Sequence, residues 1–231
     1  MFERLLRLSE PHLLCRGCLN PLGGSAEAGL CAACWSGLRP LPEPRCPRCA
    51  LPHPSDEACP APAAWDFGDA LWDYHGGRPP LGALLLPGIK AGERGWRGAL
   101  LAKAAAAPLP AFAADSDLVT AVPAAPQRRW TRGFDLAEDG GKQVAGRLAL
   151  PFARTLRKDW RTRRQAGESA SARRRLPRSA VTLRRSADVQ GRVVLLVDDV
   201  WTTGTTLLRC AQALLGGGAA GVRVLALFRA T

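Results

Sequence analysis

Five aliphatic residues in a row, followed at once by two acids and a threonine-glycine turn, constrain this chain more than any other feature. The segment reads VVLLVDDVWTTGTT and spans positions 193–206. An aliphatic run of this length predicts a strand, Val193–Val197, that is buried on both faces, as in a parallel sheet covered by helices. Ligands of such sheets bind at the carboxyl ends of the strands. Asp198 and Asp199 follow this strand and are therefore candidate site residues.

The turn after the two acids has the composition of a phosphate site. Backbone N–H groups of residues 202–206, threonine hydroxyls and the dipole of a helix that begins at Thr205 can surround a phosphate monoester. Gly204 allows the backbone to approach it closely. The two carboxylates can accept hydrogen bonds from the 2′ and 3′ hydroxyls of a ribose whose 5′-phosphate lies in the turn. A plain helix-capping sequence is the alternative, but the conjunction of strand, acids, turn and helix favours a sugar phosphate.

Strand and helix patterns alternate after position 64, which predicts an α/β fold with helical crossovers. We expect strands at 69–74, 118–122, 152–156, 180–183, 193–197 and 222–228, and helices at 96–107, 136–148 and 205–215. The chain would then consist of a cysteine-rich module, residues 1–64, and an α/β domain, residues 65–231. No window approaches the ~20 uncharged apolar residues of a membrane span, so we expect no membrane insertion. The N-terminal sequence MFERLLRL lacks the apolar core of a signal peptide, which predicts a cytoplasmic protein.

Seven of the eight cysteines lie between positions 15 and 59, and clustered Cys-x-x-Cys pairs in a cytoplasmic protein indicate metal rather than disulfides. Two successive pairs predict one structural Cys₄ zinc site, formed by Cys15, Cys18, Cys31 and Cys34. A redox role is the alternative, but thioredoxin-like pairs stand at the start of a helix and not in a row.

A second zinc site is incomplete in cysteines. Cys46, Cys49 and Cys59 offer three ligands, and Pro62 stands where the partner of Cys59 would fall. His53 would complete a Cys₃His site. The alternative is a lone surface histidine in a half that has lost its metal. The sequence therefore predicts one or two structural zinc ions.

The net charge of +12 is concentrated in one stretch. Residues 154–192 contain thirteen Lys or Arg and three acids, a local charge of +10. Such a block attracts nucleic acid or the phosphates of a nucleotide-like ligand. A solvated basic loop is the alternative interpretation.

Segment 193–206 resembles the phosphoribosyl-pyrophosphate signature of type I phosphoribosyltransferases. The resemblance implies that the acidic pair, Asp198 and Asp199, is catalytic and holds the ribose hydroxyls. It implies that the 5′-phosphate is bound by Val200, Trp201, Thr202, Thr203, Gly204, Thr205 and Thr206. It further implies that Mg²⁺ bridges pyrophosphate and ribose oxygens, and that an acceptor displaces pyrophosphate from C1 through an oxocarbenium-like state.

With the cysteine module in front, the whole chain resembles the ComF family, whose members join a double zinc ribbon to a type I phosphoribosyltransferase-like domain with a parallel sheet flanked by helices. Further matching segments are IKAG at 89–92, VP at 122–123, RRWTRGF at 128–134, Gln165 and the arginine run 173–175. These segments suggest contacts with pyrophosphate or DNA for Lys90, Arg128, Arg129, Arg132, Arg173 and Arg174, although each could equally be an ordinary exposed cation. Two positions depart from the family pattern: Asp135-Leu136 replaces Asn-Gln, and Leu176 replaces an Asn.

Two functions follow from the resemblance. The first is a phosphoribosyltransferase that binds phosphoribosyl pyrophosphate, or a related ribose 5-phosphate ligand, and uses an acceptor that the sequence does not identify. The second is a non-catalytic protein that handles single-stranded DNA during natural transformation, with bases stacked on Trp96, Trp130, Trp160 or Trp201. In a third interpretation, the zinc module docks a competence helicase or a membrane-channel partner.

Overall fold

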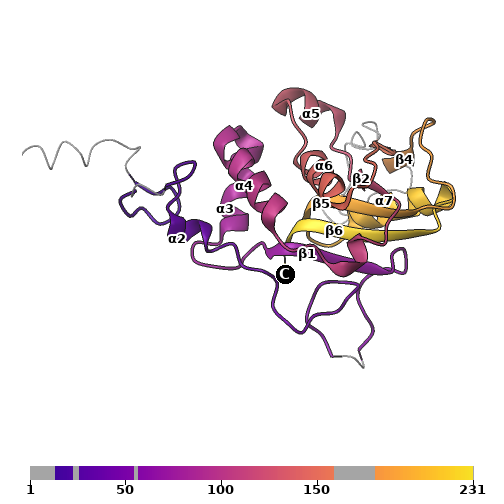
Figure 1. Ribbon diagram of the computed structural model, residues 1–231, viewed down its shortest axis with the longest axis horizontal. Coiled ribbons are helices and arrows are strands. Elements are labelled where there is room, and N and C mark those ends of the chain that lie inside the picture. The colour runs from indigo at the N-terminus through magenta and orange to yellow at the C-terminus, as the bar shows by residue number, and fades with distance from the viewer. Residues whose placement is uncertain (1–13, 23–25, 55–56, 159–179, 231) are drawn as a thin grey trace, which may run out of the picture.

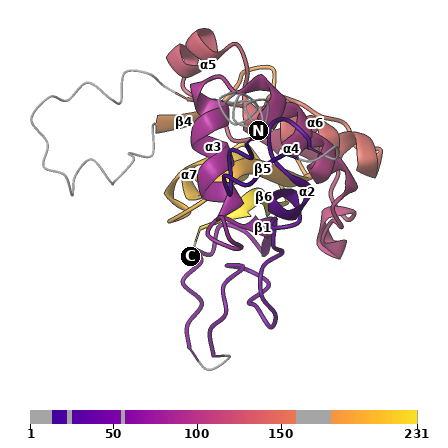
Figure 2. The same ribbon diagram turned by 90° about the vertical axis from the view of Figure 1, so that its left-hand side faces the viewer.

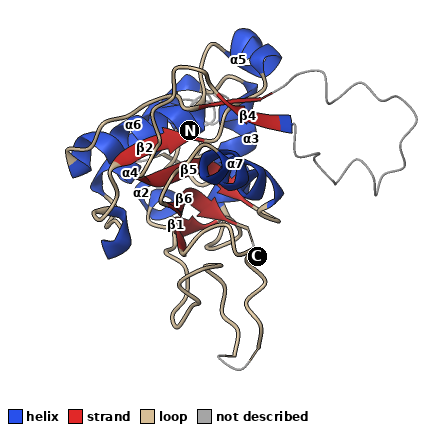
Figure 3. Ribbon diagram, turned by 90° about the vertical axis from the view of Figure 1, so that its right-hand side faces the viewer, coloured by secondary structure: helices blue, strands red, loops and turns tan. Residues whose placement is uncertain are grey.

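The computed structural model of the chain describes residues 14–22, 26–54, 57–158 and 180–230. Its centre is a four-stranded, all-parallel sheet in the order β1 (Phe67–Asp73), β6 (Gly221–Arg229), β5 (Val193–Trp201) and β2 (Leu118–Ala121). Figure 3 shows these strands side by side. The predicted parallel sheet is confirmed.

Helices cover both faces of the sheet because the apolar side chains of its strands alternate between them. Helices α3 (Leu81–Ala91), α4 (Arg94–Ala106) and α6 (Leu136–Leu148) pack on one face, against residues that include Leu195, Val197 and Leu225. Helix α7 (Thr205–Gly216) packs on the other, against Leu196 and Val224. Figure 1 shows the sheet between the two layers. The interior is therefore two apolar clusters separated by β5 and β6.

Smaller elements complete the described part of the chain. A short 3₁₀ helix, η2 (Ala111–Ala113), precedes β2, and helix α5 (Pro126–Arg132) follows it. Strands β3 (Leu156–Lys158) and β4 (Val181–Leu183) form an antiparallel pair beside the sheet. No helix among the described residues has both the length and the apolar character needed to cross a membrane.

Three expectations differ from the structure. The strand predicted at 193–197 continues to Trp201, because β6 keeps pairing with it through the acidic pair. The segment 152–156 divides: Phe152 makes a single bridge to Val119, and Leu156 begins β3. Among the helices that sequence reasoning missed are α3, where burial outweighs the internal Pro87, and α5, which begins at a proline.

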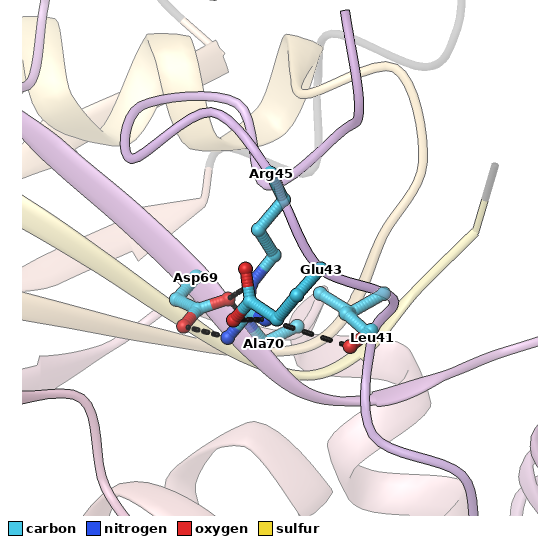
Figure 4. A network of polar contacts seen from close by, with 5 residues as sticks. All are labelled: Leu41, Glu43, Arg45, Asp69 and Ala70. Atoms are coloured by element: carbon cyan, nitrogen blue, oxygen red, sulfur yellow. Dashed lines mark hydrogen bonds and ion pairs between the residues drawn. The ribbon is translucent and has the colours of Figure 1, made fainter.

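The cysteine-rich module lies against the sheet and its helices rather than apart from them. Around the short helix α2 (Ala32–Trp35), Leu30 and Trp35 share an apolar cluster with α3 and α4. Arg45 makes a forked contact with Asp69 of β1, with Nε–Oδ1 and Nη2–Oδ2 distances of 2.9 and 2.8 Å (Figure 4). Figure 2 shows the loops around this contact extending beyond β1. The domain division at position 64 stays a prediction.

Candidate functional site

A cavity of about 350 Å³ lies at the carboxyl ends of β2 and β5. The loop after β2, the start of α6 and the last turn of α3 complete its wall. Of the predicted site residues it is lined by Lys90, Arg132, Asp198, Asp199, Val200, Thr202 and Thr206. Lys90 and the acidic pair, which are far apart in the sequence, therefore line the same cavity.

The acidic pair is electrostatically asymmetric. Asp198 is buried, and one of its oxygens accepts the Asp199 N–H at 2.8 Å. Burial, and then the charge of Asp199, raise the pKa of Asp198 well above its ordinary value. Asp199 is more exposed, and its carboxylate lies 2.7 Å from the Lys90 ammonium. The cavity therefore favours a proton on one carboxyl and an ion pair at the other.

The turn between β5 and α7 presents free donors at the start of a helix. Gly204 adopts φ +74° there, and a Cβ at this position would lie 2.9 Å from Nε1 of Trp201. The hydroxyls of Thr203 and Thr205 lie 3.0 Å apart. Within the described part of the chain, the amides of Thr202, Thr203 and Gly204 make no hydrogen bond to protein. A turn of this kind can donate several N–H groups to an anion.

Asp135, treated in the sequence only as a departure from the family pattern, belongs to the same cavity. It caps α6 and accepts the N–H groups of Ala124 at 3.1 Å and of Glu138 at 3.4 Å. Burial raises its pKa, although these hydrogen bonds oppose the rise. An acid followed three positions later by Glu138 is a helix-start signature, so the sequence did hold a signal for its capping role.

The predicted cations and tryptophans separate into distinct groups. Trp130 on α5 is 91% exposed. Trp96 and Trp201 are buried, so base stacking on these two side chains was a wrong expectation. Both indole rings pack in the apolar interior instead, and Trp201 makes an edge-to-face contact with Trp65. Outside the described residues lie Trp160, Arg173 and Arg174, together with the side chains of Arg128 and Arg129.

A smaller hollow of about 160 Å³ adjoins the first and shares Asp135 and Lys158 with it. Its basic side chains are those of Arg154, Arg157, Lys158 and Arg184. Arg154 is already engaged by Glu138, with nitrogen–oxygen distances of 2.6 and 2.8 Å. Four basic residues of the block 154–192 therefore lie beside the candidate site.

The first cysteine cluster has the dimensions of a tetrahedral metal site. Sulfur ligands at about 2.3 Å from one zinc ion lie about 3.8 Å from each other. The Sγ atoms of Cys15 and Cys34 are 3.5 Å apart, those of Cys18 and Cys31 are 3.8 Å apart, and all four lie within 4.8 Å of one another. Burial opposes ionisation of Cys15, but N–H groups of residues 31, 18 and 17 lower its pKa to about 6. The donor set fits zinc.

The second cluster brings Cys46, Cys49, Cys59 and His53 equally close, with ligand atoms within 4.8 Å. The sulfurs of Cys46 and Cys59 are 3.5 Å apart. His53 Nδ1 lies 2.9 Å from the Pro54 carbonyl, so this nitrogen carries the proton, and the buried Nε2 has no hydrogen-bond partner among the described residues. A histidine held in this tautomer presents a lone pair to a metal, so this donor set also fits zinc.

Comparisons with known proteins agree with both halves. The profile of the double zinc ribbon domain matches residues 6–62, and that of the phosphoribosyl transferase domain matches residues 134–231. The DNA utilization protein YhgH of Salmonella typhi is 33% identical over 233 residues, which cover 94% of this chain and 96% of the relative. The YhgH protein of Escherichia coli K12 is 32% identical over 241 residues, with the same coverage of both chains.

The solved structures that are similar to this chain are more distant from it than the YhgH proteins. The glutamine phosphoribosylpyrophosphate amidotransferase of B. subtilis, complexed with ADP and GMP, is 23% identical with a TM-score of 0.39, over 58% of this chain and 27% of that one. A structure described as the allosteric regulatory enzyme of purine biosynthesis is 24% identical with a TM-score of 0.36, over 57% and 24%. The matched region thus spans about a quarter of either enzyme.

Proposed function

Because the chain belongs to the ComF/GntX family, in which a double zinc ribbon precedes a phosphoribosyl transferase domain, we propose that its cavity binds phosphoribosyl pyrophosphate, or a related ribose 5-phosphate ligand, together with Mg²⁺. The observation that carries this proposal is that Asp198 and Asp199 line one cavity together with Thr202 and Thr206 of the turn, whose amides at 202–204 make no hydrogen bond to protein in the described part of the chain. Donors alone would suit any anion. Carboxylates beside them suit a ligand that carries hydroxyl groups as well as phosphate.

Each part of the ligand has a matching group. The 5′-phosphate would lie in the turn 202–206, at the N-terminus of α7. Asp198 and Asp199 would accept the ribose hydroxyls. Lys90 and Arg132 would face the pyrophosphate, where charge-assisted hydrogen bonds are strongest. The Mg²⁺ ion would be held mainly by ligand oxygens, with carboxylates of the cavity at hand, and would neutralise the charge of the pyrophosphate.

The chemistry that this arrangement supports is transfer of the 5-phosphoribosyl group. The acceptor would form a bond to C1 and lose a proton, while the C1–oxygen bond breaks and pyrophosphate leaves with its electron pair. Positioning and charge stabilisation are the protein's main contributions to such a step. The two cysteine clusters would hold two structural zinc ions, whose thiolate ligands are stable in the reducing cytoplasm.

Titration calorimetry with phosphoribosyl pyrophosphate and Mg²⁺ tests the proposal. We expect saturable binding by the wild type and at least a hundredfold weaker binding by the double variant Asp198→Asn/Asp199→Asn. Circular dichroism and zinc content serve as controls that the variant is folded. Equal affinity of the two proteins would remove the role given to the carboxylates.

Single-stranded DNA is a second candidate ligand, favoured by Trp130. A tryptophan that is 91% exposed, on a short helix beside a cavity with basic walls, is suited to stack on an unpaired base. The relatives at 32–33% identity are named DNA utilization proteins. We expect a Trp130→Ala variant to bind oligothymidylate about tenfold more weakly, corresponding to roughly 1–3 kcal/mol per stacked base, and to keep its affinity for phosphoribosyl pyrophosphate. Binding that is absent or insensitive to salt would exclude this function.

A further inference from the structure

Arg229, the last residue of β6, is a buried cation that donates hydrogen bonds to backbone carbonyls and lies over the ring of Trp201, 4.7 Å from its centroid. It is 6% exposed. Its guanidinium donates to the carbonyl of Cys49 at 3.1 Å, of Trp201 at 2.8 Å, of Thr202 at 2.7 Å and of Ala230 at 2.6 Å. No carboxylate among the described residues forms an ion pair with it. Burying a guanidinium is costly, and the hydrogen bonds to these four carbonyls offset that cost while joining them through one side chain.

Two of these carbonyls belong to the phosphate turn. In a planar trans peptide unit the C=O and the following N–H point in opposite directions. Arg229 holds the carbonyls of Trp201 and Thr202, so the N–H groups of Thr202 and Thr203 are directed away from it. These two amides are free of protein partners in the described part of the chain. The guanidinium therefore fixes the orientation of the turn's donors from behind.

The carbonyl of Cys49 belongs to the second cysteine cluster. The Cys46–Cys49 knuckle reaches the back of the same turn through Trp65, whose indole donates to the Arg48 carbonyl at 2.9 Å and packs edge-to-face on Trp201. The knuckle is also joined to β1, because the amide of Gly68 donates to the carbonyl of Pro47 at 2.8 Å. Since Cys49 supplies both a ligand sulfur and this carbonyl, metal binding at the knuckle and the position of Arg229 depend on one residue.

We propose that Arg229 couples the second zinc site to the phosphate turn, so that occupancy of either site raises the affinity of the other. This inference rests on the proposed function, because it needs a phosphate ligand in the turn. Zinc would fix the Cys46–Cys49 knuckle, and with it the Cys49 carbonyl that accepts a hydrogen bond from Arg229. Arg229 in turn fixes the phosphate turn through the carbonyls of Trp201 and Thr202. Coupling between two binding sites is reciprocal by thermodynamic necessity, so the effect is measurable from both sides.

Zinc release by the full chain is the first measurement, with ribose 5-phosphate as the probe and a chromogenic chelator as the acceptor. We expect saturating ribose 5-phosphate to slow the release of one of the two zinc ions by about tenfold, within the range usual for coupled sites, and to leave the other unchanged. A His53→Ala variant identifies which phase belongs to the second site. In return, His53→Ala should bind ribose 5-phosphate about tenfold more weakly.

Arg229→Lys is the decisive variant. It keeps the buried charge but cannot reach carbonyls on both sides with a rigid fork. We expect it to bind two zinc ions and to bind ribose 5-phosphate more weakly, with second-site release no longer slowed by the ligand. Arg45→Lys, which alters a different link between this half of the module and the sheet, is the matched control and should keep the coupling.

The outcomes separate the two proposals. Wild-type protein that fails to bind ribose 5-phosphate at millimolar concentration refutes the proposed function, and the coupling with it. Binding that leaves both release phases unchanged refutes the coupling alone, as does an Arg229→Lys variant that behaves like the wild type. A general loss of stability would speed both phases together, and would show Arg229 to be merely structural.

Discussion

Replacing Asp198 by Asn should abolish ligand binding and at the same time stabilise the folded protein. The carboxyl group is buried, stands next to Asp199 and has a pKa raised by burial and by that neighbour. The hydrogen bond that it accepts from the Asp199 amide, 2.8 Å long, can be accepted equally by the side-chain oxygen of an asparagine. The nearby cation, Lys90, is engaged by Asp199. The variant therefore removes an ionisable group whose charged form the site disfavours, and it keeps the hydrogen bond.

The expected stabilisation of the Asp198→Asn variant is of moderate size. Single stabilising substitutions commonly contribute about 0.5–2 kcal/mol, and about 1 kcal/mol raises Tm by roughly 2–4 °C in a chain of this size. The control is Asp199→Asn. It loses the 2.7 Å contact with Lys90 but also removes the charge that acts on Asp198. These effects oppose each other, so its Tm should change little, while binding is lost in both variants.

The stabilisation should depend on pH in a defined direction. Because the folded-state pKa of Asp198 is raised, the folded protein keeps a proton that the unfolded chain gives up above about pH 4. The carboxyl group therefore costs stability as pH rises from about 4 to its folded-state pKa. The Tm difference between variant and wild type, measured by differential scanning fluorimetry at each pH, should be near zero in acid and grow toward neutral pH. A variant that is less stable than the wild type, or a difference that does not vary with pH, would refute the reasoning.

Two further predictions concern the turn and the second metal site. Gly204→Ala places a side chain at φ +74° and within 2.9 Å of Trp201 Nε1, so it should cost about 1–3 kcal/mol and weaken phosphoribosyl pyrophosphate binding at least tenfold. Gly98→Ala, in the open interior of α4, should instead leave binding unchanged and raise Tm slightly. For the metal, His53→Cys should retain two zinc ions per chain and release the second more slowly, whereas His53→Ala should lose it during gel filtration in chelator. Two tightly held ions in His53→Ala would show that His53 is not a ligand.

The sequence was sufficient to predict the parallel sheet and the site at its carboxyl edge. The aliphatic run before Asp198 admits few alternatives, because five such residues in a row require burial on both faces. The resemblance to a known family brought Lys90 into consideration, and the structure brings it within 2.7 Å of Asp199. Cysteine spacing was equally informative, since Cys-x-x-Cys geometry is local and depends little on the rest of the fold.

What the sequence could not predict depends on contacts between distant segments. Trp201 stands inside the segment that we propose to bind the ligand, yet strand pairing directs its ring into the core beside Trp65. Helix α3 contains Pro87, which local preference disfavours and tertiary burial tolerates. Arg229 lies 180 positions from Cys49, and no periodicity in the chain connects them. Each of these three features depends on tertiary contacts, and a pattern within a short window of sequence carries no information about such contacts.

The position of β6 in the sheet has a consequence for protein synthesis. This strand lies between β5 and β1 and supplies a hydrogen-bonding edge to each. While a ribosome is still extending the chain toward position 229, the strand that carries the acidic pair has one edge open, and β1 has no partner in the sheet. Exposed strand edges recruit other strands. Nascent chains interrupted before this point should therefore depend on chaperones. We expect the cavity at the end of β5 to form only after β6 has emerged from the exit tunnel and paired with β5.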